Sequence, residues 1–103
     1  MSAIGTGILE VGTNADPVLI DAGLTVTVNT GAKKVPKYFL IFDDNGTLLA
    51  SFVPHLDVHC HIIDENTFTI HNDSASPVAV VVLAIYELYS PGVSGFIPAS
   101  DVV

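Results

Sequence analysis

The run from Val78 to Tyr89 constrains the fold of this chain more than any other stretch. It reads Val-Ala-Val-Val-Val-Leu-Ala-Ile-Tyr-Glu-Leu-Tyr, and its β-branched residues favour a strand over a helix. Both of its alternating side-chain sets are apolar as far as Ile85. We therefore expect a central strand, covered on one side by the domain's own core and on the other by a second sheet or a neighbouring subunit.

The composition indicates one folded domain and excludes two classes of partner. Half of the 103 residues are hydrophobic and only 14% are charged, which is typical of a globular chain. Lys33, Lys34 and Lys37 are the only basic side chains, against eleven acids, and the formal net charge is -8. Such a surface repels phosphates, so we expect no nucleic-acid partner and no binding to anionic membranes. The apolar run at 78–89 is also shorter than the roughly 20 residues of a membrane-spanning helix.

Cysteine usage and the N-terminal sequence bear on the compartment and on assembly. A single cysteine, Cys60, excludes an internal disulfide and suits a reducing compartment. The first residues lack the basic and apolar regions of a signal peptide. A small domain has much surface for its volume, so a chain this poor in charge is expected to bury surface between subunits. We therefore predict a homo-oligomer or a component of a larger lattice.

Short apolar segments separated by turn signals predict an all-β fold without helices. Asn45-Gly46 between two apolar runs is a strong hairpin signal. The pattern is typical of a sandwich or a small barrel, and we predict a single antiparallel, jelly-roll-like β-sandwich of about seven or eight strands over 1–103. Its core would span 24–89, and 90–103 would form an extended C-terminal tail. The expected strands are 4–11 (an edge strand or an arm), 18–22, 24–29, 37–42, 47–53, 55–63, 67–72 and 78–89.

The segment from His55 to Ile62 carries most of the ionisable chemistry of the chain. Strand alternation predicts one polar face and one apolar face, with Cys60 among the apolar, core-facing residues. The expected polar set is His55, Asp57, His59 and His61, and the expected apolar set is Leu56, Val58, Cys60 and Ile62.

His59 and His61 are the candidate ligands of a divalent metal, because histidines two apart on a strand can face one ion. A third ligand would have to come from elsewhere, and the candidates are His55, Asp57, His71 and Glu65. His59-x-His61 followed by Glu65 also resembles the first motif of cupins, which would imply a metal-dependent enzyme. The alternatives are a solvated or subunit-facing polar surface without a cofactor, and a metal-binding or pH-sensitive contact between symmetry-related chains.

Two further groups are candidates for an interface. Lys33, Lys34 and Lys37 form the sole basic patch on an acidic chain and could dock against an acidic neighbour. Tyr86 and Tyr89 flank the end of the central run and could pack at a contact or form a platform for a sugar. The serines do not lie in a nucleophile elbow, so we expect no hydrolase and, more generally, no enzyme.

Three segments together resemble small β-sandwich domains of phage virions, including head-decoration proteins, tail-fibre tips and H-type lectin-like sandwiches. They are Thr27–Leu40 with its Gly…Val-Pro loop, Asn66–Asn72 (Asn-Thr-Phe-Thr-Ile-His-Asn) and Leu83–Tyr86. The resemblance implies a trimeric or otherwise symmetric virion component, with a trimer favoured, that is assembled in the host cytoplasm and contacts a capsid or fibre protein. The expected function is therefore non-enzymatic decoration or cementing of a capsid, or capping of a fibre. The alternatives are a carbohydrate-binding fibre tip and the cupin-like enzyme.

Overall fold

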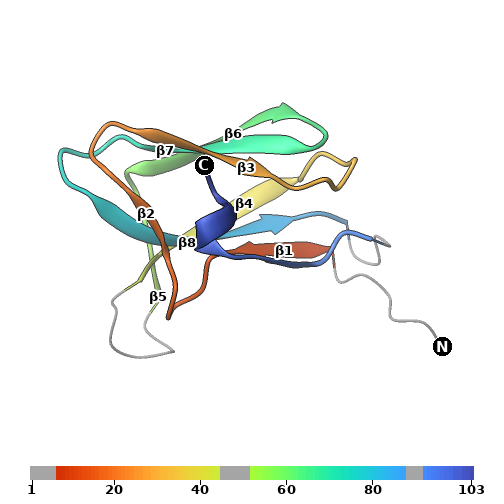
Figure 1. Cartoon of the computed structure of the whole chain (residues 1–103), viewed down its shortest axis with the longest axis horizontal. Coiled ribbons are helices and arrows are strands. Elements are labelled where there is room, and N and C mark those ends of the chain that lie inside the picture. Colours follow the sequence, from red (N-terminus) through yellow and green to blue (C-terminus); the bar gives the residue numbers. More distant parts are fainter. Residues whose placement is uncertain (1–6, 45–51, 88–91) are drawn as a thin grey trace.

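The computed structural model describes residues 7–44, 52–87 and 92–103, which form two β-sheets packed face to face (Figure 1). The predicted all-β sandwich is confirmed. Within these residues, no helix has the length and hydropathy that crossing a bilayer would need. The elements are β1 (Ile8–Val11), β2 (Val18–Ile20), β3 (Thr25–Asn29), β4 (Tyr38–Asp44), β5 (Phe52–Pro54), β6 (Val58–Asp64), β7 (Thr67–Asn72), β8 (Val78–Ile85), β9 (Gly95–Ile97) and a 3-10 turn, η1 (Ala99–Asp101).

The larger sheet is organised around β8, as the apolar run predicts. Its strand order is β5-β4-β8-β1-β9, and β2 also pairs with β8. Strand β4 lies antiparallel along one side of β8 with Tyr38 opposite Ile85, while β1 and β2 share the other side. With strands on both sides, β8 has no free edge over the length of these pairings.

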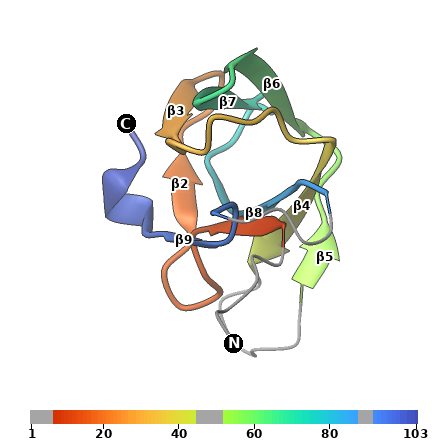
Figure 2. The ribbon, with the colours of Figure 1, turned by 90° about the vertical axis from the view of Figure 1, so that its right-hand side faces the viewer.

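The smaller sheet has the order β3-β7-β6 and lies above the larger one in Figure 2. Its two antiparallel pairings place Val28 opposite Phe68 and Cys60 opposite Ile70. The odd-numbered and even-numbered residues of β7 therefore face opposite sides, with Phe68 and Ile70 inward as expected.

The core lies between the two sheets and draws on both. Phe68 and Ile70 of β7 are almost fully buried, as are Val80 and Val82 of β8. The ring of Phe39, from β4, tilts against that of Phe68 with 4.7 Å between the centroids, which is a favourable aromatic geometry. Burial of this apolar set is the main term that stabilises the sandwich.

The C-terminal segment differs from the expected extended tail. Residues 92–103 pack on the domain itself, and β9 adds to the edge of the larger sheet parallel to β1. This is an exception to the predicted antiparallel pattern. Val93 is buried in the core, and the backbone of Val103 exchanges two hydrogen bonds with Thr27 of β3. The prolines and glycines of 90–103 suggested an extended conformation, but they also permit short pairings to the sheet.

One expected strand is shorter at its start. The run predicted at 55–63 begins as β6 only at Val58, because the chain crosses from the larger sheet to the smaller one between β5 and β6. Of the return strand predicted at 47–53, the described residues include only the end, which belongs to β5. The predicted Asn45-Gly46 hairpin turn and the start of the 4–11 strand lie outside the described residues.

Candidate functional site

The outward side of the larger sheet is unusually apolar. Strand β8 sends Val80, Val82 and Ala84 into the core, so Leu83 and Ile85 face away from it. Antiparallel register brings outward residues of β1 and β4 beside them, and β9 extends the surface. We call this surface the outer apolar face; it consists of Ile8, Tyr38, Leu40, Leu83, Ile85 and Phe96.

Large apolar side chains of this face are exposed to solvent. Tyr38 is 54% exposed, Phe96 47%, Leu40 40% and Ile8 39%. Glu10 is the only charged residue among the outward side chains that the structure describes on β1, β4, β8 and β9. Glu10 lies between Leu83 and Phe96 in the sheet, while the apolar side chains of β1, β4 and β8 adjoin one another. An exposed apolar patch of this kind is typical of an interaction site rather than of a solvated surface.

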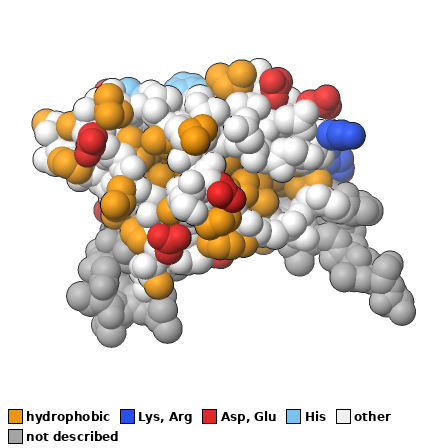
Figure 3. All heavy atoms as spheres, viewed as in Figure 1, with side chains coloured by type: hydrophobic (Ala, Val, Ile, Leu, Met, Phe, Trp, Pro, Cys, Tyr) orange, Lys and Arg blue, Asp and Glu red, His pale blue; other side chains and the backbone are white. Residues whose placement is uncertain are grey.

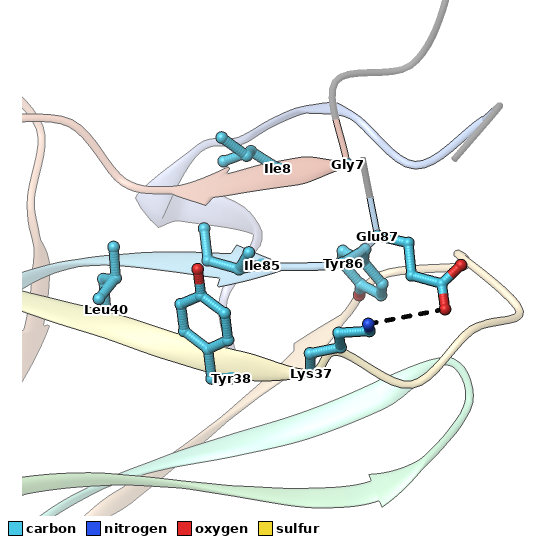
Figure 4. Close-up of a pocket in the computed structure, with 8 residues that line it drawn as sticks. All are labelled: Gly7, Ile8, Lys37, Tyr38, Leu40, Ile85, Tyr86 and Glu87. Carbon is cyan, nitrogen blue, oxygen red and sulfur yellow. Dashed lines mark ion pairs between the residues drawn. The ribbon is translucent and has the colours of Figure 1, made fainter. Parts of the chain in front are cut away.

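One end of the outer apolar face is hollowed into an open groove of about 710 Å³. Figure 4 shows the side chains of Ile8, Tyr38, Leu40 and Ile85 on one side of the sheet. At the polar end, Lys37 Nζ lies 3.8 Å from the Glu87 carboxylate, with both side chains largely exposed. The remaining lining residues are Gly7 and Tyr86.

The outward side of the smaller sheet is mainly polar and carries three histidines, although Ile63 near the end of β6 is 61% exposed. We call His59, His61 and His71 the histidine face; pale blue atoms lie along the upper surface in Figure 3, over this sheet. His59 lies directly opposite His71 in the β6–β7 pairing. His71 therefore points outward, as expected, and shares this side with the threonines of β3 and β7.

The ring of His71 is already engaged by its neighbours. Its Nδ1 lies 2.8 Å from the Thr25 hydroxyl, and its Nε2 lies 3.8 Å from the Asp73 carboxylate. These contacts draw the imidazole towards β3 and the β7–β8 turn. His59 and His61 are exposed on β6, and the described part of the chain offers their side chains no recorded hydrogen bond or ion pair.

The other expected ligands do not join this group. His55 and Asp57 precede β6, and His55 Nε2 lies 3.0 Å from Asp43 on β4, in the opposite sheet. Glu65 lies in the turn after β6, about 13 Å along the strand from His61. Among residues 7–44, 52–87 and 92–103, no three His, Cys, Asp or Glu side chains gather in a way that could hold a metal ion. The cupin-like set is therefore not assembled within one chain.

Cys60 faces the core, as predicted from its place in the alternation. It packs against the buried cluster, and burial raises the pKa of its thiol from 9.0 to about 12. The group is therefore a neutral thiol at pH 7 and a poor nucleophile or metal ligand. Because the pKa in the folded chain is the higher one, this group stabilises the fold fully below pH 9. That contribution is lost as the pH rises towards 12.

The basic loop is exposed and is bonded to the turn between β6 and β7. Lys33 and Lys34 are exposed, and the backbone N–H of Lys33 donates to the Asn66 side chain at 2.7 Å. Lys33 has a left-handed φ of 57°.

Tyr86, in contrast, is only 4% exposed. Burial raises the pKa of its phenol, and the hydrogen bond with Thr30 acts in the opposite direction. Of the two alternatives for Tyr86, this burial favours packing over a platform for a sugar. Tyr89 lies outside the described residues.

Comparison with protein-family models, with curated proteins and with solved structures found no match. The candidate surfaces consequently depend on the geometry alone. Sequence reasoning singled out the histidines but missed Tyr38, Leu40 and Phe96 as exposed surface. The sequence could have indicated Tyr38 and Leu40, because the strand Tyr-Phe-Leu-Ile-Phe is apolar on both sides and only one side can face the core.

Proposed function

We propose that this chain is a non-enzymatic structural subunit that assembles into a symmetric homo-oligomer through its outer apolar face. The observation that carries the proposal is the exposure of Ile8, Tyr38, Leu40 and Phe96 on one side of a sheet whose other side forms the core. A second copy of the same chain is the simplest occupant, because an isologous contact needs only one self-complementary surface.

The breadth of the face is compatible with this occupant. The face spans four neighbouring strands about 4.8 Å apart, which is roughly 19 Å across the sheet. A biological interface of ~1,000 Å² would need about 500 Å² from each copy, so the contact would include the surroundings of the face as well. The near absence of charge on the face lowers the desolvation cost of that contact.

The virion setting of this subunit is a further part of the proposal. It is supported by the resemblance of 27–40, 66–72 and 83–86 to phage decoration and fibre-tip domains. A decoration or cement protein works by burying surface, without a catalytic group. The exposed apolar face suits that role, whether the chain contacts its own copies or a capsid or fibre protein.

The test is the mass of the protein in solution with one charge placed on the face. We expect light scattering and sedimentation velocity to give an oligomer for the unmodified chain. Leu40→Lys should weaken the association at least ~10-fold, because burying an unpaired ammonium is costly. Leu56→Lys is the matched control, since Leu56 is 85% exposed and lies outside the face. A monomer at micromolar concentration, or equal effects of both variants, would contradict the proposal.

A further inference from the structure

Strand β6 leaves one edge of the smaller sheet open. It is the last strand in the order β3-β7-β6, so one side of its backbone has no strand partner among the described residues. Edge strands are commonly protected by lysine or proline, and the sequence Val-His-Cys-His-Ile-Ile-Asp contains neither. The only irregularity is a register shift between Ile62 and Asp64, beyond the histidines. This edge can therefore accept another strand at 58–61.

The two histidines of β6 are the free imidazoles of the histidine face. His59 and His61 lie two residues apart on the same side, about 7 Å from each other along the strand. His71 is held by Thr25 and Asp73. Two imidazoles fall short of the three or four ligands that Zn²⁺ takes, so a complete site needs ligands from another chain.

We propose that His59 and His61 form half of a transition-metal site, and that a second copy paired antiparallel along β6 supplies the other half. With a two-fold axis beside Cys60, His59 lies opposite His61 of the partner subunit, and the reverse pair follows by symmetry. Cross-strand neighbours are about 5 Å apart at Cβ, so the four imidazoles stand at the corners of a rectangle of about 5 Å by 7 Å. That spacing lets all four rings converge on one ion.

Strand geometry makes this register well defined. A two-fold axis perpendicular to the sheet keeps the outward sides of both copies together, so the histidines meet and the cores stay on the other side. With the axis beside His61 instead, His61 would lie opposite His61 of the partner subunit, and His59 would have no histidine opposite it. Imidazole ligands suit Zn²⁺, Ni²⁺ or Cu²⁺, and a bound dication would offset part of the repulsion between chains of net charge -8.

The metal site and the outer apolar face lie on opposite sides of the sandwich, so the two ideas can be tested apart. The measurement is native mass spectrometry and titration calorimetry with Zn²⁺, on metal-free protein carrying Leu40→Lys to suppress association through the apolar face. We expect Zn²⁺ to double the mass with one ion per two chains, and EDTA to reverse the change. The same measurements on the unmodified chain should show the same Zn²⁺ stoichiometry.

Three single variants distinguish the proposed site from a site within one chain. His59→Ala and His61→Ala should each weaken Zn²⁺-dependent pairing at least ~10-fold, whereas His71→Ala should change it less than ~3-fold. Since His59 and His61 are exposed, their removal leaves the core intact, and circular dichroism checks this. Binding of one Zn²⁺ to a monomer, dependence on His71 instead of His61, or no binding at micromolar Zn²⁺ would each overturn the inference.

Discussion

Asn72 shows how one side chain can join two turns. It is fully buried, and its amide NH₂ donates to the carbonyls of Ile20, Asp21 and Ser76 at 2.8–3.2 Å. Its Oδ1 accepts from both the N–H and the hydroxyl of Ser74. The β2–β3 turn and the β7–β8 turn are thereby tied to the same residue at one end of the sandwich.

Replacing Asn72 with Ala should destabilise the fold by about 3 kcal/mol, because buried carbonyls lose their donors and a cavity is left. Urea unfolding at pH 7 measures this loss. Asn29→Ala is the control: Asn29 is exposed and only accepts a 3.4 Å bond from Thr67, so we expect a change within about 0.5 kcal/mol. Equal effects of the two substitutions would argue against the role given to Asn72.

At the scale of elements, the C-terminal segment is a structural part of the sandwich. Val93 is 3% exposed within the core, and Ile97 of β9 packs against the same cluster. Beyond η1, the backbone of Val103 lies against β3. The segment thus contacts both sheets, since β9 belongs to the larger one and β3 to the smaller one.

Val93→Ala should therefore lower the free energy of unfolding by about 2 kcal/mol, since it removes two buried methyl groups. Val103→Ala is the matched control within the same segment; Val103 is 74% exposed, and we expect a change within about 0.5 kcal/mol. Chemical denaturation of both variants measures these changes in the free energy of unfolding. A neutral Val93→Ala would restore the extended tail that the sequence suggests.

The alternation of β-strands explains why much of this fold could be predicted. Val78–Ile85 is apolar on both sides, and that pattern alone indicates a central strand. The parity of His59, His61 and His71 was predicted correctly for the same reason. The position of His55 was predicted wrongly. No local pattern in the sequence indicates that the chain changes sheets before β6, and this change leaves His55 beside Asp43. The pairing of β9 with β1 also depends on contacts distant in sequence.

At the scale of the whole molecule, the two outer surfaces have opposite chemistry. The larger sheet presents apolar side chains, while the smaller one presents histidines and threonines. The formal charge of -8 is therefore carried mainly away from the outer apolar face, where the described charges are Glu10 within the strands and the Lys37–Glu87 pair at one end. Copies that associate through this face must still overcome the mutual repulsion of their acidic surroundings.

Association through the outer apolar face should consequently strengthen with salt. Raising NaCl from about 20 mM to about 200 mM shortens the Debye length severalfold and screens like charges, and it leaves the apolar contact intact. We expect the dissociation constant of the metal-free protein to fall at least ~3-fold in sedimentation equilibrium. Weaker association at the higher salt concentration would point instead to a contact held by ion pairs between the chains.

The parallel pairing of β1 with β9 has a mechanical consequence. Leu9 lies beside Gly95 and Val11 beside Ile97, so the first and last strands of the described residues are neighbours that run in the same direction. A pulling force applied through the two ends of the chain would draw these strands past each other along their length. Once the contacts after β9 have broken, the hydrogen bonds between β1 and β9 would be loaded in shear. They would then have to break together and not one after another. A subunit held by its ends would resist tension at that seam.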